Sequence, residues 1–94
     1  GIVKATQEEL YYVNTNLEEL KIEMAQGQGE TLMGLAATVG CSKSVAEKFA
    51  GKMRANYQGV FPNGDTSPEQ LLYGVKGVVS SDIELASNCG HQQG

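Results

Sequence analysis

The chain has 94 residues, enough for one domain with a modest core, because a chain of this length buries only about 60 to 65 per cent of its unfolded surface. Its formal net charge is −4 at pH 7, whereas proteins that bind nucleic acid usually carry a basic excess on one face, so we expect no nucleic-acid partner. No run of about 18 or more apolar residues occurs, and the amino terminus lacks a basic and then apolar export signal. The sequence therefore predicts no transmembrane segment, and we expect that any export signal has already been removed.

The first helix begins after Thr6, because Thr6 and Glu9 have the spacing of a capping box, in which each side chain binds the other residue's backbone amide. An apolar stripe with alternating steps of three and four residues follows and predicts one helix. The stripe consists of Leu10, Val13, Leu17, Leu20 and Met24. The poor helix formers at residues 14–16 lie within this stripe, and since its phase does not change there, we expect packing to override propensity.

A glycine-bearing segment, residues 24–32, follows this helix. Gly27 and Gly29 are expected to end it, because glycine adopts the left-handed conformation of a helix C-cap without steric cost. The alternative is a dinucleotide-binding fingerprint, but this needs a third glycine where Leu32 stands, and a strand before the first. Glu30 at the start of the next helix would also repel a phosphate. We therefore interpret Gly27, Gly29 and Glu30 as a helix break.

The second helix is predicted over about residues 30–39 and the third from Ser44 to about Phe61. The second carries no charged residue after its first position, so we expect it to be buried on most sides. Ser44 and Glu47 form a capping box for the third helix. The third helix is mostly basic and the first mostly acidic, so the two could lie side by side, although each exposed ion pair would contribute only about 0 to 1 kcal/mol.

The fourth helix starts at a capping box of Ser67 and Gln70, with a proline in its first turn. A break is expected before a further capping box of Ser81 and Glu84, and a tail ends the chain. No strand pattern, repeat or linker is visible. The predicted fold is therefore all-α, a compact bundle of four to five short helices in a single domain, residues 1–94, which we expect to be the carboxy-terminal part of a longer exported protein.

No catalytic residue, metal site or cofactor is predicted. Four oxygen-bearing side chains alternate like the first ligands of a calcium loop, but Pro68 stands where the sharp-turn glycine is required and Gly74 where the bidentate glutamate should be. These four are Asn63, Asp65, Ser67 and Glu69. A zinc site needs about four ligands, and Cys41, Cys89 and His91 are at most a partial set. His91 also lies in the tail, which is unfavourable for a base that must activate a thiol.

Cys41 and Cys89 are predicted to form a disulfide between the end of the second helix and the end of the last. Such a bond closes a long loop and would contribute about 4 kcal/mol of stability in the chain-entropy description. It would also place the protein in an oxidising compartment.

Two motifs, MAQGQGETL at residues 24–32 and NYQGVFP at residues 56–62, follow a first helix that bears Tyr11 and Tyr12. Their order and spacing resemble the carboxy-terminal half of an uncharacterised family of exported Gram-negative bacterial proteins, described only as a domain of unknown function. The likeness extends over most of the chain. It implies a periplasmic or secreted location and no activity, because the family has no catalytic residues to carry over. The chain lacks the family's signal and its cysteine-containing amino-terminal half, so pairing of either cysteine with one in that half is the alternative to the internal disulfide.

Two functions are compatible with the sequence. The first is a non-enzymatic module that binds a protein or forms a homo-oligomer through an exposed helix face, since aromatic residues are enriched at interfaces. Its candidate residues, which would otherwise lie half-buried at the rim of the core, are Tyr11, Tyr12, Tyr57 and Tyr73. The second is a carrier of a small apolar ligand or lipid in a cavity between helices. Its candidate residues, which also suit a plain core, are Met24, Met33 and Met53.

Overall fold

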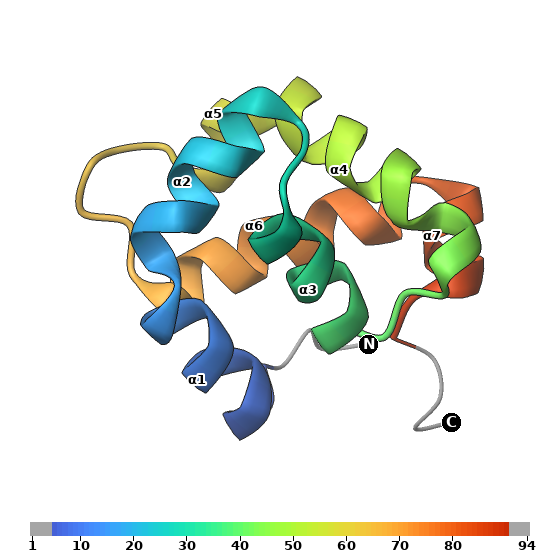
Figure 1. Cartoon of the computed structure of the whole chain (residues 1–94), viewed down its shortest axis with the longest axis horizontal. Helices are drawn as coiled ribbons and strands as arrows, with labels where there is room; N and C mark the ends of the chain where they lie inside the picture. The colour runs from blue at the N-terminus through green and yellow to red at the C-terminus, as the bar shows by residue number, and fades with distance from the viewer. Residues whose placement is uncertain (1–4, 91–94) are drawn as a thin grey trace.

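Seven α-helices and one short 3-10 helix make up residues 5–90, the part of the chain that the computed structural model describes (Figure 1). In chain order they are α1 (Gln7–Thr15), α2 (Leu17–Gln26), α3 (Glu30–Thr38), η1 (Lys43–Val45), α4 (Ala46–Ala55), α5 (Tyr57–Val60), α6 (Pro68–Ser80) and α7 (Ile83–Asn88). No strand occurs in these residues, so the predicted all-α class is confirmed. Two of the expected helices are each divided into two shorter ones.

Both divisions occur at an asparagine. Asn16 ends α1 with φ −116° and ψ 22°, and its side-chain amide donates to the carbonyl of Tyr12 at 2.9 Å. Asn56 ends α4 in the same way and donates to the carbonyl of Lys52 at 2.9 Å. Asparagine favours such bonds to nearby backbone over continuation of a helix. The expectation that packing would override propensity at residues 14–16 was therefore wrong, and Figure 1 shows the change of direction between α1 and α2.

Two of the predicted capping boxes are present. The Thr6 hydroxyl accepts from the backbone N–H of Glu9 at 3.1 Å, and the Glu9 carboxylate accepts from the N–H of Thr6 at 2.9 Å. At the start of α6, Ser67 and Gln70 make the same pair of bonds, at 3.1 and 2.9 Å. These short-range bonds satisfy amides that a helix leaves free at its first turn.

The other two predicted capping boxes are wrong. Ser44 lies within the turn η1, so α4 begins later than expected and Ser44 and Glu47 do not cap it. The break before α7 is present, but its cap is Asp82, whose carboxylate accepts from an amide in the first turn of α7. Because the cap is Asp82 and not Ser81, the third position of the helix is Leu85 and not Glu84. Glu84 therefore cannot act as the capping partner.

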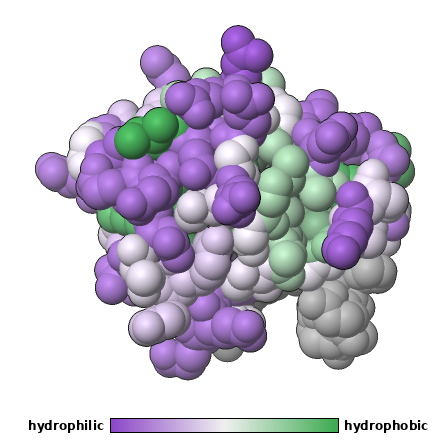
Figure 2. All heavy atoms as spheres, in the orientation of Figure 1, coloured by the Kyte–Doolittle hydropathy of each residue, from purple (hydrophilic) through white to green (hydrophobic). Residues whose placement is uncertain are grey.

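One apolar core joins the helices. Its largest fully buried side chains are Phe49, Leu20, Met24, Leu32, Leu35, Met53, Leu71, Leu72 and Leu85. Helix α3 packs against α1, α2 and α4, and after Glu30 its residues are buried or half-buried except for Ala37, so the expectation that this helix is buried on most sides is confirmed. Figure 2 shows the face of the molecule that is turned to the viewer in Figure 1. This face is largely hydrophilic, with pale green, weakly hydrophobic residues gathered between α3 and α4.

Candidate functional site

The glycine-bearing segment forms the corner between α2 and α3. Gly27 ends α2 in the left-handed conformation, with φ 75°, and its N–H donates to the carbonyl of Glu23 at 2.7 Å. Gly29 precedes α3 with φ 134°, which only glycine adopts readily. Glu30 is the first residue of α3 and is exposed.

A carboxylate of the protein itself occupies the start of α3. The Oε1 atom of Glu23 accepts from the backbone N–H of Leu32 at 2.8 Å. From the sequence we expected the Glu30 carboxylate to lie at this helix start. The carboxylate that bonds to the free backbone amide there is that of Glu23, from the preceding helix. A Cβ atom at Gly29 would overlap the Glu23 side chain, so the missing side chain at Gly29 makes room for this carboxylate.

Tyr12 closes the same corner from α1. Its hydroxyl donates to the carbonyl of Thr31 at 2.9 Å. Gly34 lies directly against this hydroxyl, because a Cβ atom there would overlap it. Burial raises the pKa of the Tyr12 phenol above its ordinary value, and the neighbouring Glu23 carboxylate raises it further. Tyr12 therefore serves the packing of α1 on α3.

The four candidate tyrosines differ in their surroundings. The Tyr57 ring packs against the ring of Phe61, with centroids 5.4 Å apart. Tyr11 on α1 is 74% exposed and Tyr73 on α6 is 73% exposed. Tyr12 and Tyr57 thus contribute to the fold, whereas Tyr11 and Tyr73 present most of their surface to solvent.

Sequence analysis missed two further exposed apolar side chains. Ile22 on α2 is 59% exposed and Ile83 at the start of α7 is 87% exposed. Ile22 lies outside the apolar stripe of its helix, which is the signal that predicts its exposure. Ile83 directly follows the cap Asp82, and its exposure depends on the position of that cap.

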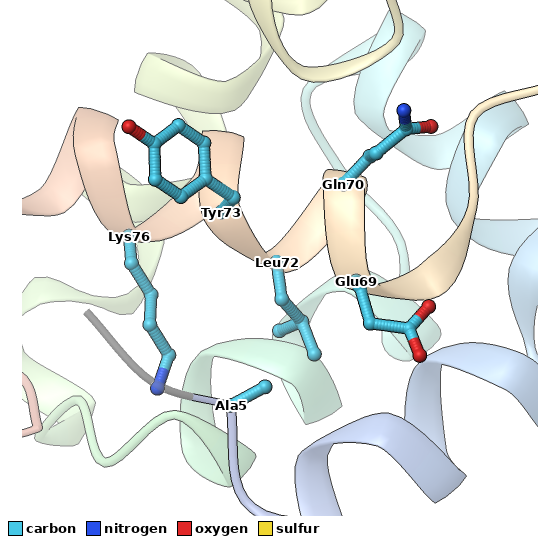
Figure 3. A pocket seen from close by; sticks show the side chains of 6 residues that line it. All are labelled: Ala5, Glu69, Gln70, Leu72, Tyr73 and Lys76. Atoms are coloured by element: carbon cyan, nitrogen blue, oxygen red, sulfur yellow. The ribbon is translucent and has the colours of Figure 1, made fainter. Parts of the chain in front are cut away.

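A shallow depression of about 380 Å³ lies beside the first turns of α6 (Figure 3). It is lined by Ala5, Glu69, Gln70, Leu72, Tyr73 and Lys76. Figure 3 shows the Leu72 side chain projecting from α6 into the space between Ala5 and Glu69, with the Tyr73 ring above it. Leu72 is almost completely buried, so it closes the floor of the depression but offers almost no surface to a partner, and the exposed apolar side chain of the lining is Tyr73.

Lys76 at one end of this depression is held by an ion pair. Its Nζ atom lies 2.7 Å from Oε1 of Glu9, a residue that is only 6% exposed. The same oxygen accepts from the N–H of Thr6 in the capping box of α1. Glu69, at the opposite end, is exposed to solvent. The charge of Lys76 is thus neutralised within the fold, while that of Glu69 faces outward.

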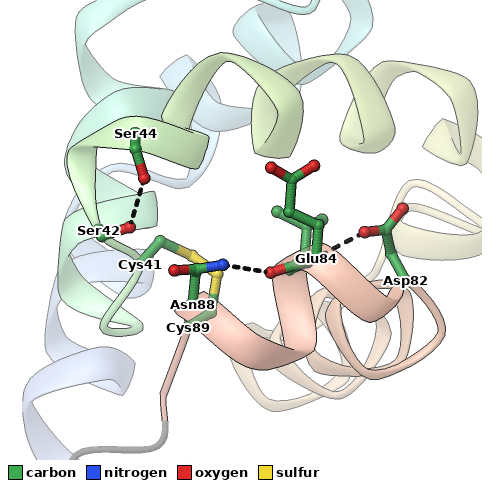
Figure 4. The surroundings of a disulfide bond; sticks show 8 residues. Cys41, Ser42, Ser44, Asp82, Glu84, Asn88 and Cys89 are labelled. Carbon is green, nitrogen blue, oxygen red and sulfur yellow. Dashed lines mark hydrogen bonds between the residues drawn. A yellow bond between two sulfur atoms is a disulfide. The ribbon is translucent and has the colours of Figure 1, made fainter.

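The predicted disulfide between Cys41 and Cys89 is confirmed (Figure 4). It joins the segment after α3 to the end of α7. Beside it, the N–H of Ser42 donates to the carbonyl of Asn88 at 2.9 Å. His91 lies outside the described residues. Within residues 5–90, no group of three or more histidine, cysteine, aspartate or glutamate side chains could hold a metal ion.

Helix α7 is also held by ion pairs with α4. The Nζ of Lys48 lies 2.9 Å from Oε1 of Glu84, and the Nζ of Lys52 lies 3.4 Å from Oδ2 of Asp82. These two lysines therefore meet carboxylates of α7, whereas the sequence suggested glutamates of the first helix. The backbone N–H of Leu85 lowers the pKa of Asp82, and the two lysines lower it further. The Lys48 and Glu84 side chains are 40% and 55% exposed, so this pair orients α7 more than it stabilises it, whereas the Asp82 side chain is only 14% exposed.

A family model described as a protein of unknown function (DUF3015) matches residues 1–89. No curated protein and no solved structure matches. In the part of the chain that the structure describes, no helix has the length and apolar character needed to cross a membrane. Because the family model covers nearly the whole sequence, the chain belongs to the DUF3015 family of proteins of unknown function.

Proposed function

We propose that this domain is a non-enzymatic periplasmic or secreted module that acts through protein–protein interaction or self-association. The observation that carries the proposal is the position of Tyr73, 73% exposed at the rim of a depression whose floor is Leu72. An exposed aromatic ring beside an apolar depression is typical of a recognition surface. The depression lies on α6, a 13-residue helix with a complete capping box, so the surface is well supported.

The disulfide supports the proposed location. Such bonds persist in oxidising compartments, which include the bacterial periplasm and the extracellular space. In this domain the bond joins positions 48 residues apart, at the ends of two different helices. The fold is therefore suited to a compartment in which this bond is maintained.

The alternative function, a carrier of a small apolar ligand, has no comparable support. Met24 and Met53 are completely buried in the core, and Met33 packs against it. Methionines so placed fill a helical core. They give no reason to prefer a carrier over an interaction module.

The proposal is tested by selecting peptides from an unbiased display library on the oxidised protein. We expect selected peptides to perturb backbone amide NMR signals of α6 and to lose at least tenfold in affinity for Tyr73→Ser, since buried aromatic anchors dominate such interfaces. The matched control is Tyr11→Ser, because Tyr11 has almost the same exposure on another helix. Self-association that is visible in sedimentation and lost in Tyr73→Ser would support the same proposal. Failure to obtain any peptide or self-contact that depends on Tyr73 would overturn it.

A further inference from the structure

We propose that the depression beside α6 accepts a lysine or arginine side chain of a partner protein, with the aliphatic stem against the Tyr73 ring and the charged end at Glu69. This inference rests on the proposed function and specifies the chemistry of the partner. It follows from the charge and the shape of the depression and from the exposed ring in its lining.

The charges of the lining favour a cation. Lys76 would repel one, but its Nζ is paired at 2.7 Å with the nearly buried carboxylate of Glu9. Glu69 carries the remaining formal charge among the lining residues. The depression with its supporting pair is thus net negative, and the whole chain also carries a formal charge of −4. An acidic partner would meet Glu69 directly and would have to displace Glu9 to reach Lys76.

The arrangement along α6 matches an amphipathic side chain. Glu69, Tyr73 and Lys76 follow one another at steps of four and three residues, so they lie on one face of α6, over about 10 Å of helix. Lysine and arginine have an aliphatic stem and a charged end, so one end can cover apolar surface while the other remains at the rim. Figure 3 shows Leu72 between the two charged ends of the depression.

The exposed ring at position 73 adds a second attraction. A cation over the face of an aromatic ring is stabilised by the ring electrons. The Tyr73 ring stands beside the apolar floor and is 73% exposed, so a basic side chain can reach it without rearrangement of the helix. Arginine is preferred over lysine, because its planar group both stacks on a ring and bonds a carboxylate through two N–H groups.

The inference is tested with short peptide probes that are identical except at one central residue: arginine, its neutral isostere citrulline, norleucine or glutamate. Amide NMR titration of the oxidised protein should show the arginine probe binding at α6 more tightly than the other three. Glu69→Gln should weaken the arginine probe about two- to fivefold, the effect of one exposed ion pair, and should leave the norleucine probe unchanged. Glu19→Gln, the same change of charge at an exposed position of α2, is the control.

The outcomes separate this inference from the proposed function. If norleucine binds α6 as tightly as arginine and Glu69→Gln changes neither, the basic partner is excluded, while a Tyr73-dependent apolar interaction stands. Tighter binding of the glutamate probe also overturns the inference, as does the absence of α6 shifts with all four probes. If the display selection yields Tyr73-dependent peptides that contain no basic residue, the proposed function is supported and this inference fails.

Discussion

The carboxylate of Glu23 accepts a hydrogen bond from the backbone N–H of Leu32 at 2.8 Å and so fixes the start of α3 from the neighbouring helix α2. This bond explains the segment that links the two helices. Gly29 has no side chain to cap α3, but its lack of a Cβ leaves the space that the Glu23 carboxylate fills. The segment is therefore a helix corner, and an internal carboxylate occupies the position in which a phosphate-binding loop would hold its ligand.

Replacement of Glu23 by alanine should destabilise the protein by about 0.5 to 2 kcal/mol, the usual cost of losing a helix N-terminal cap. The Leu32 amide then has no carboxylate acceptor, although alanine itself suits α2. Urea unfolding followed by circular dichroism measures the change. Glu19→Ala on the exposed side of the same helix should change the free energy of unfolding by less than about 0.5 kcal/mol. Equal losses for the two variants would show that the bond contributes nothing specific.

The two glycines of the corner should respond differently to alanine. Gly29→Ala combines an unfavourable φ of 134° with overlap against the Glu23 side chain, so it should cost clearly more than 1 kcal/mol (about 1 is typical of the backbone effect alone). At Gly27 the new Cβ would lie 3.0 Å from the flexible side chain of Arg54, so the cost should stay near about 1 kcal/mol.

The control for these variants is Gly77→Ala. Gly77 lies in α6, and a Cβ atom there would meet nothing within 4 Å, so alanine should stabilise by about 0.4 to 1 kcal/mol. Melting temperatures should therefore fall in the order Gly77→Ala, wild type, Gly27→Ala, Gly29→Ala. A Gly29 variant that melts with the wild type would contradict the geometry of the corner.

Some features that depend on neighbours in the sequence could be predicted, whereas most features that depend on tertiary contacts could not. The capping boxes of Thr6 with Glu9 and of Ser67 with Gln70 span three positions and could be found by pattern, but the same pattern also predicted boxes at Ser44 and Ser81 that do not form. The disulfide could be predicted because the chain has only two cysteines. The bond from Glu23 to α3 spans nine positions and depends on the angle between two helices, which periodicity does not report.

The candidate site shows the same limit. Sequence analysis gave no means of ranking the four tyrosines, and only the structure separates the exposed rings of Tyr11 and Tyr73 from the packed rings of Tyr12 and Tyr57. The depression joins Ala5 to a helix more than sixty positions later in the chain. Composition and spacing therefore identify the aromatic residues, but the packing of α1 on α6 decides which of them borders a depression.

The carboxylate of Asp82 should make stability depend on pH in the acid range. Its pKa in the folded protein is lowered, first by the bond from the Leu85 amide and then by Lys48 and Lys52. A lowered folded-state pKa means that the stabilisation is present above the ordinary aspartate pKa, about 3.9, and is lost as the pH falls through the folded-state value. Asp82→Asn should thus be less stable than the wild type at neutral pH, and the difference should disappear in acid.

Asp82→Ala separates the two contributions of this residue. Asparagine can still cap α7, whereas alanine cannot, so the alanine variant should be the less stable of the two at every pH. Asp65→Asn in the exposed loop before α6 removes the same charge and is the control for net charge. Urea unfolding at intervals from acid to neutral pH gives the four curves of stability against pH, for the wild type and the three variants. Parallel curves for wild type and Asp82→Asn would contradict the lowered pKa.

Loss of the disulfide should have the largest effect on stability. The bond closes a loop between positions 48 residues apart, which corresponds to about 4 kcal/mol in the chain-entropy description. A domain of this length has a total stability of roughly 5 to 14 kcal/mol, so the reduced protein retains a small margin. Leu85 is the only fully buried side chain of α7, and the ion pair of Glu84 in this helix with Lys48 is largely exposed. Hydrogen exchange should therefore show α7 losing protection before α6.

The double variant Cys41→Ala/Cys89→Ala tests the same bond without a reductant. It should match the reduced wild type in urea unfolding, and addition of reductant should not change it further, because no other cysteine is present. Mass spectrometry of the unreduced wild type should find no free thiol. Two free thiols in protein isolated from its native compartment would contradict the internal pairing, and the oxidising location proposed for the domain would lose its physical support, since that location is argued from this bond.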